Sequence, residues 1–590
     1  MELAASDDPT AQSRWISLST LWSNVAIVAA VLFGILVVID NGTIAIFDEA
    51  VYATQAQSLA DGSWVGPRPA LDVDPNGVAN PLLDSTSVGR GAIAYARHPL
   101  YPLLLTPAWA VGGYFGTLLV SATGVLAAAT CAAFLARRID RRYGVPALWL
   151  AAVGSPLVVD APVLWAHSVA AAGAGLLFLG LLRVLDGSRV ALHAAYTVAA
   201  AVFTVLVRSE GVLFVCAAGL VAALSGLRWR RTLTVEVRRI AIGGSVVVIA
   251  VLSYLFDGWW AGRVGSGGYG TDVSALVLGE RAGPLDAAWV SLVRPGRGVV
   301  GDPTLVLAAA CGALVLGAFA IRINARWRSV PIASLTASAV CWLWALGAKP
   351  DTGSFMVTGL LAAFPALLAS LLLIDSRTFR YRDISITLVT LVLAAAILLA
   401  TVYEVGGSTE WGGRYFHILL VPLMGPIVLV LDRCWGRLTK LERRAVVLPA
   451  VALLVVPPVM GLQFVSSRKS IVAGQNRHLE EVAPAPLSQG KLPLAVVWRS
   501  DPDGSSRLFW SQRGRIDVLA ISDLASLFRL LDTTRVGERR RLVMVTDQAA
   551  RNFALILAAK EGATWRVVDG TEWSDGVLVM FEIELVGDPR

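Results

Sequence analysis

The sequence predicts an all-α polytopic membrane protein of about 13 transmembrane helices, followed by a small C-terminal extracytoplasmic α/β domain. Of the 590 residues, 56% are hydrophobic and 16% are charged, whereas an ordinary soluble domain has roughly 25% charged residues. The apolar residues gather in runs of about 17–25, the length that crosses a hydrocarbon core of roughly 30 Å as a helix. This composition excludes a soluble globule. A membrane β-barrel is also excluded, because the runs do not alternate in polarity as barrel strands do.

The first apolar run follows a polar, acidic segment and lacks a small-residue cleavage site, so we expect a retained helix and not a signal peptide. In chain order, the runs predict helices at roughly 24–40, 114–136, 144–160, 163–182, 190–207, 211–227, 240–256, 303–321, 330–347, 354–374, 384–403, 415–431 and 445–464.

The loops between these helices alternate in charge, and every basic cluster falls on the same side. The positive-inside rule makes that side cytoplasmic, which predicts a multi-pass plasma-membrane protein with a cytoplasmic N-terminus. The clusters are Arg137, Arg138, Arg141 and Arg142; Arg228, Arg230, Arg231, Arg238 and Arg239; Arg322, Arg326 and Arg328; Arg377, Arg380 and Arg382; and Arg433, Arg437, Lys440, Arg443 and Arg444.

Three parts follow from this topology. Residues 1–23 form a cytoplasmic segment, and residues 24–464 form a transmembrane domain with long outer loops at 41–113 and 257–302. Residues 465–590 remain outside. Strand-like runs at 494–498, 541–546 and 575–585 alternate there with helix-like segments, which predicts an α/β fold. This domain either shapes acceptor access or is a structural cap over the helices, and it makes no bonds itself.

The net charge of +7 does not indicate nucleic-acid binding, because the basic residues sit in short loops and report topology. The five cysteines lie in or beside apolar runs without metal-ligand spacing. Almost no charged residue lies near the middle of a predicted helix, which argues against a coupled ion transporter. The functional residues are therefore expected at the outer membrane surface.

The first outer loop places Asp48 and Glu49 directly after the first helix, at the start of an amphipathic stretch that includes Tyr52. A carboxylate in this position can simply cap the helix. It can also act as a general base, because partial desolvation at the membrane surface raises its basicity.

A second segment, Arg97-His98-Pro99-Leu100-Tyr101, precedes an apolar stretch interrupted by proline. One interpretation is an interfacial anchor of basic and aromatic residues. The other is that Arg97 and His98 contact the phosphate of a lipid substrate whose tail follows the apolar stretch.

Further polar residues are expected at the same depth, and each alone can be a helix end held by an ion pair, as Arg208 with Glu210. Together they suit displacement of a phosphate-linked leaving group by a hydroxyl, with arginine stabilising the phosphate charge. These residues are Asp160, Arg208, Glu210, Trp411, Arg414 and Tyr415.

Four features, in their order along the chain, resemble those of the GT-C superfamily, which includes protein O-mannosyltransferases and lipid A aminoarabinose transferases. They are Asp48-Glu49, His98-Pro99-Leu100-Tyr101, Asp160, and Gly412-Gly413-Arg414-Tyr415. The resemblance covers residues 24–215 and 404–420 but not the tail. The chain departs from the family in having one proline after His98 where members often have two, and Arg97 where a lysine sometimes occurs.

The resemblance implies a GT-C module followed by a variable set of helices, and an inverting transfer of sugar at the outer face. The donor is a polyprenyl-phosphate sugar, the acceptor is a hydroxyl on a glycan, lipid or protein, and membrane lipids surround the chain. No cofactor is expected, and Mg²⁺ or Mn²⁺ on adjacent carboxylates is the less favoured alternative. The implied catalytic residues are Asp48, Glu49 and Asp160; the implied phosphate ligands are Arg97, His98, Arg208 and Arg414; and the expected substrate contacts are Tyr52, Tyr101, Glu210, Trp411 and Tyr415.

Three alternatives stay open. A lipid-linked glycan ligase or polymerase uses similar outer arginines, although its main loop is expected late in the chain. A flippase or transporter of lipid-linked sugars needs a polar path through the bilayer. A non-catalytic binding protein that has the same fold is the third.

Overall fold

The computed structural model describes residues 18–75, 79, 85–88, 92–95, 98–187, 189–225, 233–264, 288–295, 302–323, 329–348, 356–401, 411–483, 492–498, 508, 510–521, 530, 541–547, 565–567, 573–574 and 578–585. The chain forms two compact units. Unit 1 consists of Met1–Ile39, Leu118–Phe256 and Val273–Val465, and unit 2 consists of Asp40–Thr117, Asp257–Asp272 and Ser466–Arg590.

Within the described residues, ten helices are long and apolar enough to span a membrane, which confirms a polytopic α-helical membrane protein. They match ten of the predicted helices. The helices are α2 (Leu18–Ile39), α4 (Leu100–Ile139), α6 (Ala166–Asp186), α7 (Val190–Val207), α9 (Leu233–Arg263), α12 (Asp302–Ile323), α13 (Ser329–Gly347), α16 (Arg382–Thr401), α17 (His417–Gly436) and α18 (Lys440–Val482).

The three remaining predicted helices are shorter or broken. Where one helix was predicted over 144–160, α5 (Gly144–Ala152) ends before Gly154 and is followed by a 3-10 turn, η3 (Pro156–Asp160). Over 354–374, α14 (Leu360–Ala363) and α15 (Pro365–Leu373) meet at Phe364-Pro365. A proline lacks the backbone N–H that would continue the preceding helix, which accounts for both interruptions. The third, α8 (Glu210–Leu224), is a helix of only 15 residues.

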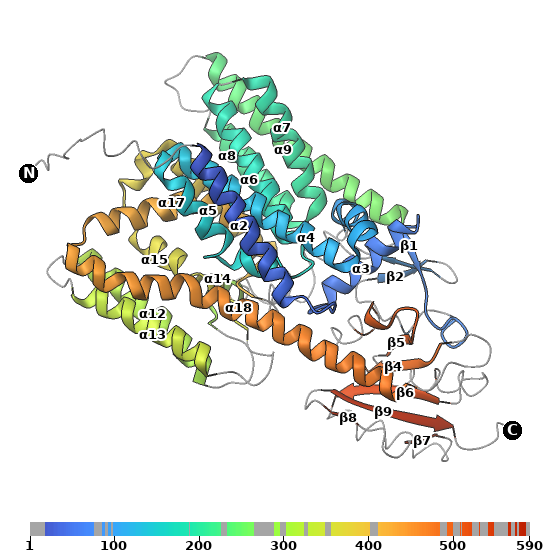
Figure 1. Cartoon of the computed structure of the whole chain (residues 1–590). Coiled ribbons are helices and arrows are strands. Elements are labelled where there is room, and N and C mark those ends of the chain that lie inside the picture. Colours follow the sequence, from blue (N-terminus) through green and yellow to red (C-terminus); the bar gives the residue numbers. More distant parts are fainter. Residues whose placement is uncertain are drawn as a thin grey trace, which may run out of the picture. The chain divides into compact units, whose positions relative to one another are not determined.

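In unit 1, α6 and α17 are almost fully buried, and they pack against each other at the centre of this unit. Helix α7 lies along α6, and α12 lies beside α13 (Figure 1). Glycines explain how closely α6 and α7 approach. A methyl group added at Gly173 would lie 2.5 Å from the hydroxyl of Thr204, and one added at Gly180 would lie 2.2 Å from that of Thr197.

Unit 2 combines helix α3 (Phe47–Ala60), the adjoining parts of α4, α9 and α18, and two sheets. A small antiparallel sheet has the order β1-β3-β2, with strands β1 (Val65–Pro67), β2 (Ser85–Val88) and β3 (Ala92–Tyr95). The larger sheet has the order β5-β4-β6-β9-β7, and β8 pairs with β9. Its strands are β4 (Leu494–Trp498), β5 (Asp517–Ile521), β6 (Arg541–Asp547), β7 (Trp565–Val567), β8 (Trp573–Ser574) and β9 (Leu578–Leu585).

Strand β4 pairs in parallel with β5 and β6, whereas β6 and β9 are antiparallel. The three strands predicted in the tail correspond to β4, β6 and β9. The helix-like segments predicted between them lie almost entirely outside the described residues.

The first long loop shares a hydrophobic core with the tail. Ala70, Val73 and Ala79 are buried together with apolar residues of β4, β5, β6 and β9. The backbone N–H of Ala520 also donates to the carbonyl of Ala79 at 3.2 Å. The structure thus groups residues of the first loop with the C-terminal sheet, although more than 400 residues separate them in the sequence.

Candidate active site

Helix α3 begins at Phe47, and its first turn contains the two adjacent acids. The carboxylate of Glu49 accepts hydrogen bonds from the backbone N–H of Ala45 at 2.5 Å and of Ile46 at 3.2 Å. The residue that satisfies the backbone at this helix start is therefore Glu49, and Asp48 lies within the first turn and does not occupy the cap position.

Glu49 is also the centre of a buried polar network in unit 2. The hydroxyl of Tyr114, on α4, donates to Glu49 Oε1 at 2.8 Å. Lys469, on α18, lies with its Nζ 3.3 Å from that hydroxyl and 3.3 Å from Asp40 Oδ1. The hydroxyl of Thr43 donates to the carbonyl of Lys469 at 2.9 Å. Three helices are thus linked through the start of α3.

Asp48 is 1% exposed, although it lies at the start of a helix. Tyr52 follows one turn later on α3, and its ring packs edge-on against that of Tyr101 with the centroids 4.8 Å apart. This arrangement holds a carboxylate and two aromatic rings on adjoining helices, away from bulk water. A carboxylate in such surroundings suits proton abstraction from an alcohol.

His98 lies at the start of α4, where its Nδ1 is 2.7 Å from Asp257 Oδ2 of α9. This carboxylate fixes the orientation of the ring. Arg97, predicted to contact phosphate beside His98, lies outside the described residues.

A second buried cluster lies in unit 1, around Asp160 at the end of η3. The side chains of Asp160 and His417 are both fully buried, with His417 Nδ1 2.9 Å from Asp160 Oδ2. The other ring nitrogen, Nε2, lies 3.3 Å from the carbonyl oxygen of Gly412. The two ring nitrogens of His417 therefore face a carboxylate on one side and a backbone carbonyl on the other.

Burial raises the pKa of Asp160, while the positive charges of His417, Arg414 and Arg208 act in the opposite direction. Desolvation is the larger effect, so this carboxyl group binds its proton more strongly than an ordinary aspartate.

Arg414 enters this cluster from a tight turn. Gly412 and Gly413 have φ angles of +68° and +61°, a left-handed backbone that favours glycine. The guanidinium carbon of Arg414 lies 4.8 Å from the centre of the Tyr415 ring and 5.9 Å from that of Trp165. One guanidinium nitrogen also donates to the Tyr415 hydroxyl at 3.0 Å. The charged group is thus held by aromatic faces.

Arg208 approaches the same tyrosine from the turn between α7 and α8, with its guanidinium carbon 5.9 Å from the Tyr415 ring centre. Its guanidinium donates to both carboxylate oxygens of Glu210, at 3.0 Å and 2.5 Å. The expected ion pair between Arg208 and Glu210 is therefore present. It uses two of the five N–H donors of Arg208.

The structure brings five predicted residues together in unit 1: Asp160, Arg208, Glu210, Arg414 and Tyr415. Trp411 is buried just before the glycine turn and stacks on Phe464 with the ring centres 6.3 Å apart, so it supports the turn. In unit 2 the structure places Asp48, Glu49, Tyr52 and Tyr101 on α3 and the start of α4.

Sequence reasoning left three residues out of the predicted site: His417, Tyr114 and Lys469. A signal for Lys469 was present, because this lysine follows the last apolar run at the end opposite to the basic loop of the same helix. His417 follows the Gly-Gly-Arg-Tyr motif by two residues, but nothing local identifies Asp160 as its partner.

In the part of the chain that the structure describes, no group of three His, Cys, Asp or Glu side chains is arranged to hold a metal ion.

No protein-family model and no curated protein matches the sequence. The structure is similar to ArnT from Cupriavidus metallidurans in the apo state, with a TM-score of 0.51 and 14% identity, over 96% of this chain and 98% of that one. The same values hold for that protein bound to undecaprenyl phosphate. The oligosaccharyltransferase of Archaeoglobus fulgidus gives a TM-score of 0.47 and 12% identity, over 91% of this chain and 70% of that one.

The similarity to ArnT runs over nearly the whole of both chains and includes the tail, where the sequence carries no resemblance. The described helices and the C-terminal sheet therefore belong to one known architecture. The chain has the fold of ArnT.

Proposed function

We propose that this chain is a membrane glycosyltransferase that moves a sugar from a polyprenyl-phosphate donor to a hydroxyl group of a glycan, lipid or protein acceptor. The observation that carries the proposal is the buried Arg414 guanidinium beside Tyr415, Trp165 and the Asp160–His417 pair. The ArnT fold supports it, because one ArnT structure contains undecaprenyl phosphate.

Arg414 and Arg208 suit the departing phosphate. When the bond between the anomeric carbon and the donor phosphate breaks, its electron pair stays on the phosphate oxygen, which gains negative charge. A guanidinium offers a planar fork of N–H donors that matches phosphate oxygens. In a dry site, such donors stabilise developing charge far better than in water.

Asp48 supplies the base in this proposal. The acceptor hydroxyl oxygen attacks the anomeric carbon from the side opposite the phosphate, its proton passes to the Asp48 carboxylate, and polyprenyl phosphate leaves. A single displacement of this kind inverts the anomeric centre. Glu49 has a different role, because its carboxylate is committed to the backbone of the helix start.

The reaction is assigned to the outer face of the plasma membrane on the charge pattern of the loops. A cysteine introduced at the exposed Asp61, in a chain without its five native cysteines, tests this assignment. We expect a membrane-impermeant maleimide to label it from outside in intact cells. Labelling only after the cells are permeabilised would contradict the assigned topology.

The function itself is tested with the full chain in nanodiscs. Undecaprenyl phosphate binding is measured by native mass spectrometry, and transfer is measured with undecaprenyl-phosphate donors that carry radiolabelled hexose, pentose or amino sugar. We expect Arg414→Lys to lose about 100-fold or more in transfer, because an ammonium is a point charge without the planar fork. Arg437→Lys, at the exposed residue that follows the C-terminal end of α17, is the matched control.

Transfer by the wild type with any of these donors, and its loss in Arg414→Lys, support the proposal. Movement of intact lipid-linked sugar across the bilayer without cleavage would instead identify a flippase. Full activity of Arg414→Lys would show that net charge alone suffices, and the assignment of Arg414 as the phosphate ligand would then be wrong.

A further inference from the structure

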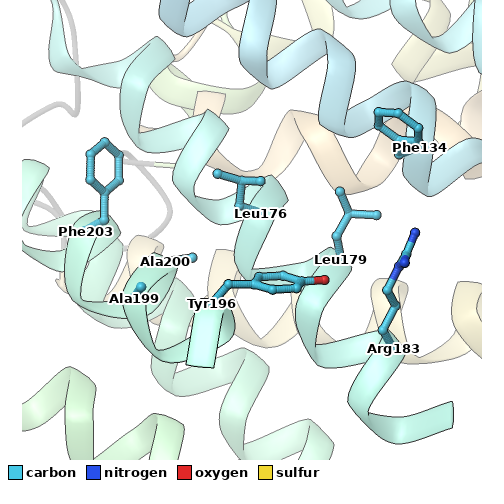
Figure 2. A pocket seen from close by; sticks show the side chains of 8 residues that line it. All are labelled: Phe134, Leu176, Leu179, Arg183, Tyr196, Ala199, Ala200 and Phe203. Carbon is cyan, nitrogen blue, oxygen red and sulfur yellow. The ribbon is translucent and has the colours of Figure 1, made fainter. Parts of the chain in front are cut away.

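A groove runs along the surface of unit 1 between α4, α6 and α7 (Figure 2). Its volume is about 510 Å³, within the roughly 300–1,000 Å³ of small-molecule sites. Phe134 of α4, Leu176 and Leu179 of α6, and four residues of α7 from Tyr196 to Phe203 form its walls. The lining is almost wholly apolar.

The groove owes its shape to the two glycines of α6 described above. A methyl group at Gly180 would lie 2.6 Å from the Tyr196 ring, and one at Gly173 would lie 2.9 Å from the Phe203 ring. Both aromatic rings of α7 can therefore lie against α6 and form one wall. Leu176 is 46% exposed, so the groove opens where these spanning helices meet the surrounding lipid.

One end of the groove is cationic. Arg183 lines it one turn before the end of α6, and Figure 2 shows the Tyr196 hydroxyl turned toward the side where Leu179 and Arg183 lie. This end of α6 is the one predicted to face the cytoplasm. An arginine near the end of a spanning helix reaches the interface, where lipid headgroups lie.

Further arginines and aspartates lie at this end of α6. Asp186, three residues after Arg183, pairs with Arg138 at 2.7 Å and with Arg382 at 3.2 Å. Arg138 also pairs with Asp383 at 2.7 Å. These ion pairs connect α4, α6 and α16 at the same end of α6 as Arg183, which lines the apolar groove.

We propose that this groove binds an anionic phospholipid of the leaflet on the basic side, with an acyl chain between α6 and α7 and the headgroup phosphate at Arg183. The apolar walls fit a hydrocarbon chain and exclude water, and the cationic end selects a negatively charged headgroup. Basic pockets between membrane helices on the cytoplasmic side characteristically hold such headgroups. The inference does not depend on the proposed transfer reaction.

The polyprenyl tail of the donor is apolar like an acyl chain, so it also fits the walls of the groove. The donor phosphate, however, is not expected at Arg183. It is proposed to lie at Arg414, at the beginning of α17, whereas Arg183 lies on the opposite, basic side predicted from the loops. The test must therefore separate phospholipid from undecaprenyl phosphate.

We would reconstitute the full chain with palmitoyl-oleoyl phosphatidylglycerol or with the matching phosphatidylcholine, and count bound lipids by native mass spectrometry. Phosphatidylglycerol with a diazirine in one acyl chain would then map the contact by peptide analysis. We expect preferential retention of phosphatidylglycerol and crosslinks to the α6 and α7 residues that line the groove. Arg183→Gln should lower that preference about fivefold.

Three further variants distinguish binding in the groove from binding to the rest of the lipid-facing surface. Ala199 is exposed and lines the groove, so Ala199→Phe should fill it and reduce crosslinking without disturbing the core. Ala195→Phe, exposed on the same helix outside the groove, is the matched control. Arg141→Gln removes an exposed basic residue that does not line the groove, and should leave the preference unchanged.

Three results would overturn the proposal. Equal retention of the two phospholipids would remove headgroup selection, and unchanged crosslinking in Ala199→Phe would place the lipid elsewhere. Displacement of phosphatidylglycerol from the groove by stoichiometric undecaprenyl phosphate would assign the groove to the donor tail.

Discussion

The hydroxyl of Tyr114 and the carboxylate of Glu49 are joined by a hydrogen bond of 2.8 Å, between residues 65 positions apart in the chain. Glu49 also accepts from the backbone before α3, so this one bond ties the first turn of α3 to α4. Asp48 is the residue before Glu49. The orientation of the proposed base therefore depends on a neighbour that itself takes no part in proton transfer.

Tyr114→Phe removes the hydroxyl that donates to Glu49, so the buried carboxylate oxygen loses this hydrogen bond. A hydrogen bond to a charged group contributes about 1.5–3 kcal/mol, so we expect a lower melting temperature and a reduced kcat with little change in donor KM. Thermal unfolding and steady-state kinetics on the purified chain measure both. Tyr381→Phe, which removes the hydroxyl of an exposed tyrosine in unit 1, is the control. If the two variants behave alike, Tyr114 has no positioning role.

Asp48→Asn keeps the size of the side chain but cannot accept a proton at neutral pH. Loss of a positioned general base typically costs about 10²–10⁴-fold in rate, so transfer should fall by that factor while undecaprenyl phosphate binding persists. Asp61→Asn changes the exposed carboxylate at the other end of α3 and should be neutral. Turnover within a few-fold of wild type in Asp48→Asn would return Asp48 to a structural role.

The Asp160–His417 pair predicts a pH dependence. Because burial raises the pKa of Asp160 in the folded chain, its protonated form stabilises the fold. That contribution is fully present below the ordinary aspartate pKa of about 3.9 and is lost as pH rises through the raised pKa. The positive charge and hydrogen bond of His417 lower this pKa, so their removal raises it further.

We therefore expect His417→Ala to lose more stability relative to wild type as pH rises above the ordinary aspartate pKa of about 3.9, and the acid limb of its activity profile to lie at a higher pH. His417→Asn keeps a neutral donor and should shift less. Melting temperatures and the pH profile of kcat/KM report the two effects. Parallel profiles for wild type and His417→Ala would contradict the coupling.

The tail contacts the network around Glu49 through Trp510, whose ring centre lies 5.0 Å from that of Tyr114. Arg513 also donates to the amide oxygen of Gln57, on α3, at 2.8 Å. We expect Trp510→Ala and Arg513→Gln to raise the KM for the acceptor several-fold while undecaprenyl phosphate binding stays intact. Arg541→Gln, which breaks an ion pair on the large sheet, is the control. Weakened donor binding would show that the tail helps to hold the donor.

Most of the fold follows from hydropathy, because crossing a bilayer imposes both a length and a composition on each helix. The prediction was wrong at two places where the sequence stays apolar but the helix stops. Continuous helices were predicted through residues 154–156 and through Phe364-Pro365, and the structure interrupts both. A hydropathy window averages over many residues, whereas a single proline removes a backbone hydrogen bond and can end a helix.

The candidate site was predictable in part for a related reason. Charged residues at helix ends are conspicuous in so apolar a chain, and this identified Asp48, Asp160 and Arg414. Their partners were not predictable, because contacts such as Asp160 with His417 or Glu49 with Tyr114 join distant residues and have no local pattern.

The shared core of Ala79 and the C-terminal strands sets an order of events during synthesis. At about 5–20 residues per second, the ribosome needs roughly 25–100 s to proceed from residue 79 to the end of β9. During that time the apolar side chains of Ala70 and Val73 have no strands to cover them. The shared core of unit 2 can therefore close only after β9 has been made, so the first loop waits for a partner that the ribosome supplies more than 400 residues later.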